Sequence, residues 1–125
     1  MRLAQIQMHV TADKTANLRH AEELLRSVRG ADMAILPEMF CCPYDNSCFR
    51  AYGEPAGGAA YQMLSRTARE LGLWLVGGSL PELDDGRVYN TSFVFDPQGA
   101  CVARHRKMHL FDIDVEGGQR FRESD

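Results

Sequence analysis

Lys107 stands in the run Arg106-Lys107-Met108-His109-Leu110-Phe111-Asp112-Ile113-Asp114, directly after a segment that is typical of a strand. Its ammonium group is expected where a strand opens into a loop, and loops on a rigid scaffold often carry function. Glu38 holds a similar place in Leu36-Pro37-Glu38-Met39-Phe40, after a short apolar strand. Because the carboxyl ends of parallel strands share one edge of a sheet, we expect this acid and this base to meet there.

Each of the two residues also has a purely structural interpretation. Glu38 alone would be a solvated carboxylate at a strand end, although Pro37 cannot donate to a sheet ladder and so directs the chain out of the sheet at this point. Lys107 belongs to the basic run Arg104-His105-Arg106-Lys107, and such runs usually form a solvated face. The pattern of the whole chain is needed to choose between the two interpretations.

Two helices are predicted from apolar residues at helical spacing. Asp13 is a suitable cap for the first helix, and Gly30 ends it. The second helix is expected over residues 59–71. The apolar stripes are Leu18, Ala21, Leu24, Leu25 and Val28 in the first helix, and Tyr61, Leu64, Ala68 and Leu71 in the second.

Strands are predicted from alternation and from short apolar runs. The expected segments are residues 5–10, 33–36, 73–76, 88–95 and 100–104, the last two joined into a hairpin by Asp96-Pro97-Gln98-Gly99. Asp84-Asp85-Gly86 is a further turn signal. About twenty residues after Leu36 are expected to form a loop with little regular structure. This order predicts an α/β fold, with the helices packed on one face of the sheet.

Composition excludes several classes of protein. The chain has 125 residues, 45% of them hydrophobic, which is enough for a core and argues for one small domain. A net charge of −3 with interspersed signs gives no footprint for nucleic acid. No run of about 18 apolar residues is present to span a membrane, and Gln5 and Gln7 interrupt the apolar N-terminus, which argues against a signal peptide.

The four cysteines are Cys41, Cys42, Cys48 and Cys101, and they contain no Cys-x-x-Cys spacing. A disulfide framework and a zinc site are therefore not expected. Without an export signal, the predicted location is the reducing cytoplasm. We interpret Cys41 and Cys42 as small hydrophobic residues, although they follow Glu38 closely.

Several motifs together resemble the nitrilase superfamily of carbon–nitrogen hydrolases. They are Leu36-Pro37-Glu38 with Pro43-Tyr44, Gly77-Gly78-Ser79, Tyr89-Asn90-Thr91 and, above all, Arg106-Lys107-Met108-His109-Leu110-Phe111. The stretch from Tyr89 to Asp114 is most similar to the omega-amidase branch. The resemblance implies the amino-terminal half of a four-layer α-β-β-α sandwich, with residues 1–125 as a single partial domain.

The family uses a Glu–Lys–Cys triad, and the resemblance assigns the general base to Glu38 and the oxyanion-stabilising cation to Lys107. Nearby carboxylates are expected to keep Lys107 protonated. A second active-site glutamate is implied in the loop after the lysine, and Glu123 matches that place better than Glu116; the alternative for Glu123 is a surface acid near the C-terminus. Tyr44 is expected to line the substrate pocket, a role compatible with packing on the core.

The implied function is hydrolysis of a small linear amide through a thioester, with no cofactor or metal, in a protein that is commonly a homo-oligomer. The nucleophilic cysteine of the family comes well after the lysine, in a Gly-x-Cys-Tyr-Asp-like segment that these residues do not contain. The chain alone is therefore expected to be inactive.

Two other functions stay open. One is a non-catalytic half-domain. The other is a metal-dependent hydrolase built on His109, Asp112 and Asp114, whose spacing matches no established metal motif. Tyr89-Asn90-Thr91 is interpreted as structural.

Overall fold

The protein is described by a computed structural model that covers residues 1–118 and 120–123. Within these residues, a main sheet of six strands has the order β1-β2-β3-β5-β4, and β6 pairs with the other edge of β5. The strands are β1 (Leu3–Gln5), β2 (Met33–Ile35), β3 (Trp74–Val76), β4 (Leu80–Asp84), β5 (Arg87–Phe95) and β6 (Cys101–Arg106). The first three are parallel, and β5 runs antiparallel to β3, β4 and β6. Strands β2 and β6 therefore run in the same direction, and their carboxyl ends lie at the same edge of the sheet.

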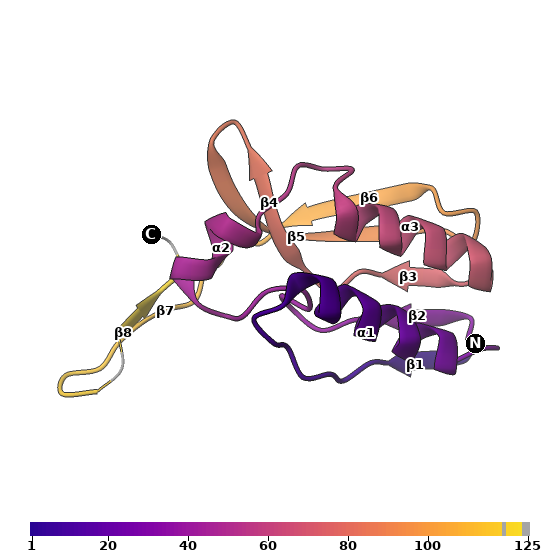
Figure 1. Cartoon of the computed structure of the whole chain (residues 1–125), viewed down its shortest axis with the longest axis horizontal. Coiled ribbons are helices and arrows are strands. Elements are labelled where there is room, and N and C mark those ends of the chain that lie inside the picture. Colours follow the sequence, from indigo (N-terminus) through magenta and orange to yellow (C-terminus); the bar gives the residue numbers. More distant parts are fainter. Residues whose placement is uncertain (119, 124–125) are drawn as a thin grey trace.

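Helices α1 (Lys14–Ser27) and α3 (Ala59–Leu71) lie side by side on one face of this sheet (Figure 1). The carboxylate of Asp13 caps α1 by accepting a hydrogen bond from the backbone N–H of Ala16 at 2.9 Å. The first turn of α3 is capped from a distance, because the buried carboxylate of Glu54 accepts from the N–H of Ala60 at 2.7 Å. Both predicted helices are confirmed.

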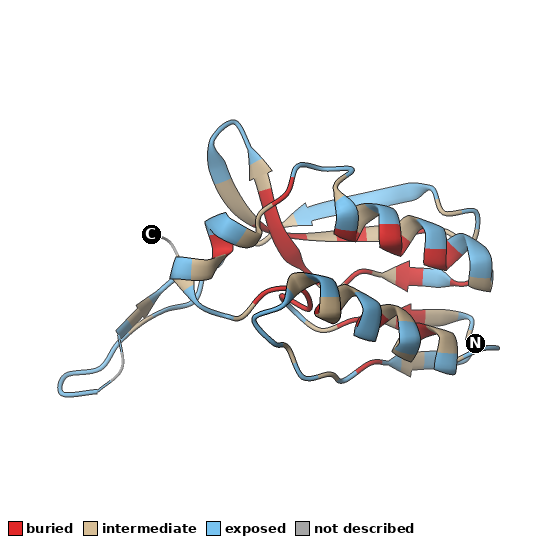
Figure 2. Ribbon diagram, viewed as in Figure 1, coloured by how far each residue is buried: buried red, intermediate tan, exposed pale blue. Residues whose placement is uncertain are grey.

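The core lies between the helices and the sheet, where the buried residues concentrate (Figure 2). Alternate residues of β5 supply it: Phe93 and Phe95 are buried, and the ring of Tyr61 from α3 packs edge-on against them at 5.2 and 4.9 Å. Strand side chains on the other face of the sheet are more exposed to solvent, and Trp74 remains 41% exposed. This two-layer arrangement confirms the predicted α/β class with helices on one face.

Two sequence-based expectations were wrong. The first strand was predicted over residues 5–10, but β1 ends at Gln5, so only that residue of the alternating segment belongs to it. Ile6 continues the contact, through its N–H to Ile35 at 2.9 Å. The segment expected to be an irregular loop contains helix α2 (Asn46–Tyr52), whose N-terminus is capped by Asp45. This short helix buries Phe49 and contacts β4, so tertiary packing stabilises a helix that is too short to form alone.

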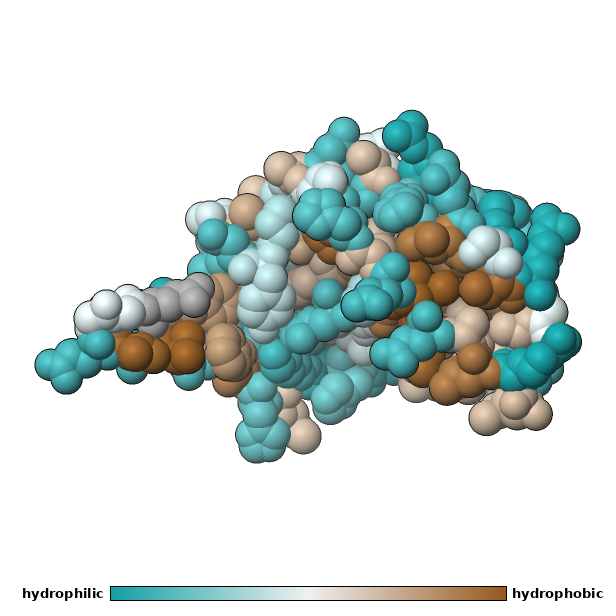
Figure 3. All heavy atoms as spheres, turned by 90° about the horizontal axis from the view of Figure 1, so that it is seen from below, coloured by the Kyte–Doolittle hydropathy of each residue, from teal (hydrophilic) through white to brown (hydrophobic). Residues whose placement is uncertain are grey.

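The last strands, β7 (Asp112–Asp114) and β8 (Arg120–Arg122), form an antiparallel hairpin that projects from the body of the molecule (Figure 1). Hydrophobic side chains lie along this arm (Figure 3), and Phe111 and Val115 are each 50% exposed. The arm was not predicted from the sequence. No helix in the part of the chain that the structure describes is long and apolar enough to cross a membrane.

Candidate active site

The glutamate and the lysine that the sequence singles out converge at one edge of the sheet. Glu38 follows β2 and Lys107 is the first residue after β6. The Nζ atom of Lys107 lies 2.9 Å from Oε1 of Glu38. The predicted convergence is confirmed, while the chemical roles of the two residues stay predictions.

The backbone around Glu38 adopts a conformation that few sequences allow. Met39 has a φ of 50°, uncommon for a residue with a side chain. A Cβ atom at Gly78 would lie 2.0 Å from the carbonyl oxygen of Pro37, so only glycine permits this approach. The hydroxyl of Ser79 accepts a hydrogen bond from the N–H of Met39 at 3.0 Å. The Gly77-Gly78-Ser79 motif thus positions the turn that presents Glu38.

Lys107 is held at both its backbone and its side chain. Its N–H donates to the carbonyl of Asn90 at 2.8 Å, which ties the start of the loop to β5. Its ammonium donates to Glu38, to Glu123 at 2.8 Å and to the hydroxyl of Tyr44 at 3.2 Å. Burial lowers the pKa of Lys107, but these hydrogen bonds outweigh burial and the pKa is raised, so the side chain stays a cation.

Glu123, directly after β8, reaches the same place and is far more enclosed than Glu38. Its side chain is 3% exposed, against 49% for Glu38. Burial raises its pKa, but hydrogen bonds from Asn90, Lys107 and the N–H of Phe111 more than offset this and hold the pKa of Glu123 below its usual value. Glu123 is therefore a buried, ionised carboxylate 2.8 Å from the ammonium.

Tyr44 lies on the outer side of the same cluster. Its hydroxyl donates to Glu123 at 3.0 Å. Its ring stacks on Phe121 with centroids 5.3 Å apart and meets Phe49 edge-on at 5.5 Å. The aromatic ring is thus part of the local packing, and the hydroxyl is part of the charged site.

Asn90 is a site residue that the sequence interpretation missed by treating Tyr89-Asn90-Thr91 as structural. Its side-chain amide donates to Glu38 at 2.8 Å and to Glu123 at 2.7 Å. Strand alternation was the available signal, since Asn90 must face away from Tyr89 and Thr91. We call Glu38, Tyr44, Asn90, Lys107 and Glu123 the Lys107 cluster.

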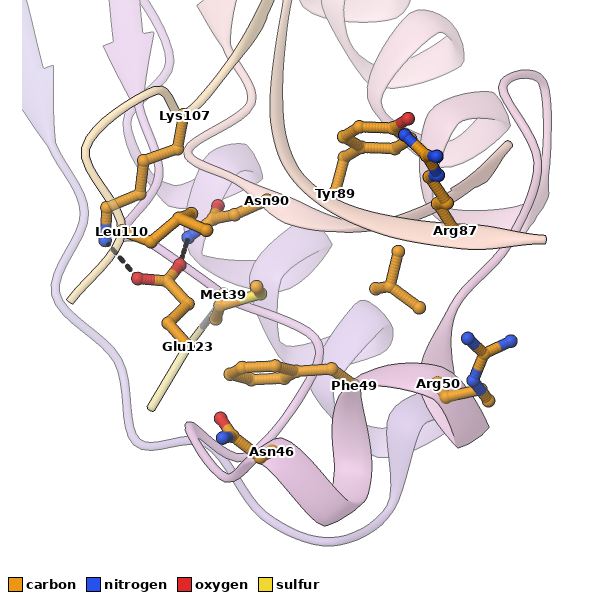
Figure 4. A pocket seen from close by; sticks show the side chains of 11 residues that line it. Met39, Asn46, Phe49, Arg50, Arg87, Tyr89, Asn90, Lys107, Leu110 and Glu123 are labelled. Atoms are coloured by element: carbon orange, nitrogen blue, oxygen red, sulfur yellow. Dashed lines mark hydrogen bonds and ion pairs between the residues drawn. The ribbon is translucent and has the colours of Figure 1, made fainter. Parts of the chain in front are cut away.

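A cavity of about 440 Å³ opens beside this cluster, a size suited to a small molecule. Lys107, Asn90 and Glu123 line one end of it, and Arg50 and Arg87 line the other (Figure 4). Two hydrogen-bonded carboxylates and one ammonium beside a cavity can exchange protons and stabilise a developing negative charge.

The cysteines near Glu38 are poor nucleophiles as they stand. Cys41 and Cys42 are buried, and burial raises the pKa of each to about 12. Their thiols are therefore almost entirely protonated at neutral pH, and a thiolate is the reactive form.

The residues of the metal hypothesis form no ligand set. Asp114 pairs with Arg120 and Arg122 at 3.7 and 3.9 Å. Among residues 1–118 and 120–123, no three His, Cys, Asp or Glu side chains are grouped so that they could hold a metal ion.

The chain is similar in sequence to omega-amidases over nearly its whole length. Omega-amidase NIT2 of Danio rerio is 48% identical over 126 residues, which is 99% of this chain and 46% of the relative. Omega-amidase NIT2 of Homo sapiens is 44% identical over 98% of this chain and 45% of its own length. The chain therefore spans just under half the length of these relatives.

Solved structures share the fold. Saccharomyces cerevisiae Nit3, a member of branch 10 of the nitrilase superfamily, superposes with a TM-score of 0.77 at 34% identity, over 86% of this chain and 44% of that one. The carbon–nitrogen hydrolase superfamily protein XC1258 of Xanthomonas campestris gives a TM-score of 0.81 at 27% identity, over 88% of this chain and 41% of its own. The sheet and its helices thus correspond to half of the predicted four-layer sandwich. The carbon–nitrogen hydrolase family model matches residues 2–125, and the chain belongs to this family, within the nitrilase superfamily.

Proposed function

We propose that this chain supplies the general base and the oxyanion-stabilising cation of an amidase that acts on small linear amides, and that the nucleophile is a cysteine from a segment beyond these residues. The observation that carries the proposal is the position of the Lys107 ammonium, 2.9 Å from Glu38 and 2.8 Å from Glu123, beside a cavity of small-molecule size. The similarity to the omega-amidases supports the same class of substrate.

The proposed reaction begins when Glu38 takes the proton of the cysteine thiol and the thiolate forms a bond to the amide carbon. The amide oxygen becomes an oxyanion, and Lys107 stabilises it with a charge that is already in place. Glu38 then returns its proton to the departing nitrogen, the carbon–nitrogen bond breaks, and ammonia leaves a thioester behind. Water, deprotonated by Glu38, hydrolyses the thioester to a carboxylic acid and restores the thiol. No cofactor or metal takes part.

The two carboxylates suit different duties in this scheme. Glu38 is half exposed, as a group that exchanges protons with substrate should be. Glu123 is buried and bonded on both oxygens, which favours a fixed charge that keeps Lys107 a cation. Pairs of titratable groups in contrasting environments are typical of acid–base sites.

The test is ammonia release from omega-amides and simple aliphatic amides by the full-length protein, with mass spectrometry to trap the acyl-enzyme. We expect turnover, an acyl adduct on a cysteine other than Cys41 or Cys42, and loss of turnover in Glu38→Gln. The 125-residue chain alone should be inactive. A full-length protein without turnover on any amide would favour the non-catalytic alternative, and an acyl adduct on Cys42 would contradict our assignment of the nucleophile.

We further propose that the protein works in the cytoplasm and as a homo-oligomer, without nucleic-acid or membrane partners. All four cysteines are free thiols, which suits a reducing compartment. Sedimentation of the full-length protein tests the assembly, and a monomer at micromolar concentration would contradict it.

A further inference from the structure

The side-chain amide of Asn90 lies between the two carboxylates of the Lys107 cluster. Its Nδ2 atom donates to Oε1 of Glu38 and to Oε1 of Glu123, at 2.8 and 2.7 Å. A primary amide has two N–H donors, so each carboxylate receives a hydrogen of its own. A reversed amide would set Oδ1 against two anionic oxygens, so the site itself determines the orientation. Asn90 is 7% exposed, and water has little access to compete for these bonds.

The oxygens of the two carboxylates are not equally occupied. In Glu123, Oε1 accepts from Asn90, and Oε2 accepts from Lys107, from Tyr44 and from the N–H of Phe111. In Glu38, Oε1 accepts from both Asn90 and Lys107. No donor among residues 1–118 and 120–123 reaches its Oε2.

We propose that Asn90 is a positioning residue that assigns different duties to the two carboxylates. By occupying Oε1 of Glu38 together with Lys107, it leaves Oε2 as the oxygen that accepts the thiol proton. By holding Glu123, it keeps the second carboxylate out of acid–base exchange. This inference rests on the amidase function proposed above.

An asparagine suits this place because its amide stays neutral at every stage of the reaction. A second cation between the carboxylates would neutralise the pair and weaken the base, and a carboxylate would repel both. The neutral amide orients both carboxylates toward the single ammonium of Lys107. It does not change the net charge of the site, which is −1 for the two carboxylates and Lys107 together. The geometry of the base is thereby set independently of its charge.

The charged and titratable groups around Asn90 come from four parts of the chain. They are Glu38 after β2, Tyr44 before α2, His105 and Lys107 at the end of β6, and Glu123 after β8. A second, shallower pocket is lined by His105 together with Asn90 and Glu38. The pH profiles should therefore be compared only between variants that all retain His105.

The test is steady-state kinetics of full-length Asn90→Ala against pH. Without the amide, Glu123 loses a hydrogen bond that helps to hold its pKa down, and Glu38 loses a donor that fixes its orientation. We expect kcat to fall by about 10- to 100-fold, within the range that general bases contribute, with KM changed by less than about threefold. We also expect the acid limb of the kcat/KM profile to move to higher pH, because the site needs Glu123 ionised and Asn90 no longer helps to hold its pKa down.

Two further variants sharpen the result. Asn17→Ala removes another buried asparagine, which bonds to Thr11 and lies outside the Lys107 cluster, and it should leave kcat and the acid limb unchanged. Asn90→Asp has the same shape as the native residue but adds a third carboxylate, so its acid limb should move further up than that of Asn90→Ala. If Asn90→Ala loses its cooperative melt, the isosteric Asn90→Asp decides the question.

The outcomes separate this inference from the proposed function. If Glu38→Gln is inactive while both Asn90 variants keep their kcat within twofold and their acid limb in place, the role of Asn90 is wrong and the amidase proposal stands. A loss confined to KM would make Asn90 a substrate-binding residue and would also overturn the inference. If Glu38→Gln retains full activity, Glu38 is not the base and both proposals fall.

Discussion

Arg106 and Lys107 are neighbours in sequence, yet their side chains enter two separate carboxylate clusters on opposite faces of the sheet. Asn90 and Thr91 divide in the same way, because successive residues of a strand point to opposite faces. Asn90 joins the Lys107 cluster, and Thr91 joins a second group that we call the Glu82 cluster. Its members are Glu82, Asp84, Thr91, Arg104 and Arg106.

The Glu82 cluster is centred on an enclosed carboxylate, although its members Asp84 and Arg104 are 54% and 41% exposed. The side chain of Glu82 is 1% exposed, and its Oε2 accepts from Thr91 at 2.7 Å and from Arg106 at 3.0 Å. The guanidinium of Arg106 also donates to Asp84 at 2.5 Å and lies over the ring of Tyr89, 3.7 Å from its centroid. The hydrogen bond and charge of Arg106 hold the pKa of Asp84 below its usual value.

The Lys107 cluster also combines carboxylates with a cation, but it borders a cavity. The side chains of Lys107 and Glu38 are 28% and 49% exposed, and Lys107, Asn90 and Glu123 line that cavity. The carboxylate at the centre of the Glu82 cluster is enclosed, whereas these three lining residues border a space that a small molecule could enter. Under the proposed function, we assign the chemistry to the Lys107 cluster and a structural role at the end of β6 to the Glu82 cluster.

The largest effect is expected from Lys107→Met in the full-length protein. Removal of the cation that faces the oxyanion should lower kcat/KM by about 10³-fold or more. Arg104→Met is the matched control. Arg104 is a 41% exposed cation on β6, the strand that leads to Lys107, and it belongs to the Glu82 cluster. Equal activity of Lys107→Met and Arg104→Met would remove the distinction between the clusters.

Glu82→Gln should affect stability and not chemistry. The substitution keeps the shape but removes the buried charge that Arg106 contacts, at a cost of about 2–3 kcal/mol in the free energy of unfolding. Denaturant titration should show a lower midpoint with an unchanged slope. The folded variant should keep kcat within about threefold; a 100-fold loss of kcat at full folding would show that Glu82 acts on the reaction.

Glu123→Gln should lower both activity and stability, with a definite pH dependence. The pKa of Glu123 is lower in the folded state than its ordinary value of about 4.5, so its contribution is present above that pH. As the pH falls through the folded value the contribution is lost. The stability gap between wild type and Glu123→Gln should therefore be largest near pH 7 and shrink below pH 4.5. A gap that is constant from pH 7 to pH 3 would contradict the ionised, buried state.

Tyr44→Phe should have the smallest effect. The ring keeps its contacts with Phe49 and Phe121, and only the hydroxyl bonds to Lys107 and Glu123 disappear. We expect kcat/KM to fall by about three- to tenfold, since one hydrogen bond to a charged group is worth about 1.5 kcal/mol or less when the others remain. A loss above 100-fold in steady-state assays would make Tyr44 a direct participant in the reaction.

Local patterns were enough to predict much of the scaffold. The second helix was predicted over the same residues that α3 occupies, because its apolar spacing is a local signal. Helix α2 and the β7–β8 arm were missed, since a seven-residue helix and two three-residue strands carry too little periodicity to be recognised. The alternation at residues 5–10 predicted too long a strand, because β2 is only three residues long and offers no partner beyond Gln5.

For the site, the sequence alone determined the chemical types and their places: an acid and a base, each just after a strand, in motifs that resemble one family. Only the tertiary structure decided which of these groups bond to one another and which are buried. Asn90 bonds to residues 52 and 33 positions away along the chain. Which oxygen is occupied and which carboxylate is buried depend on these distant pairings, and hydrogen-bond geometry is set in space, where no pattern of neighbouring residues records it.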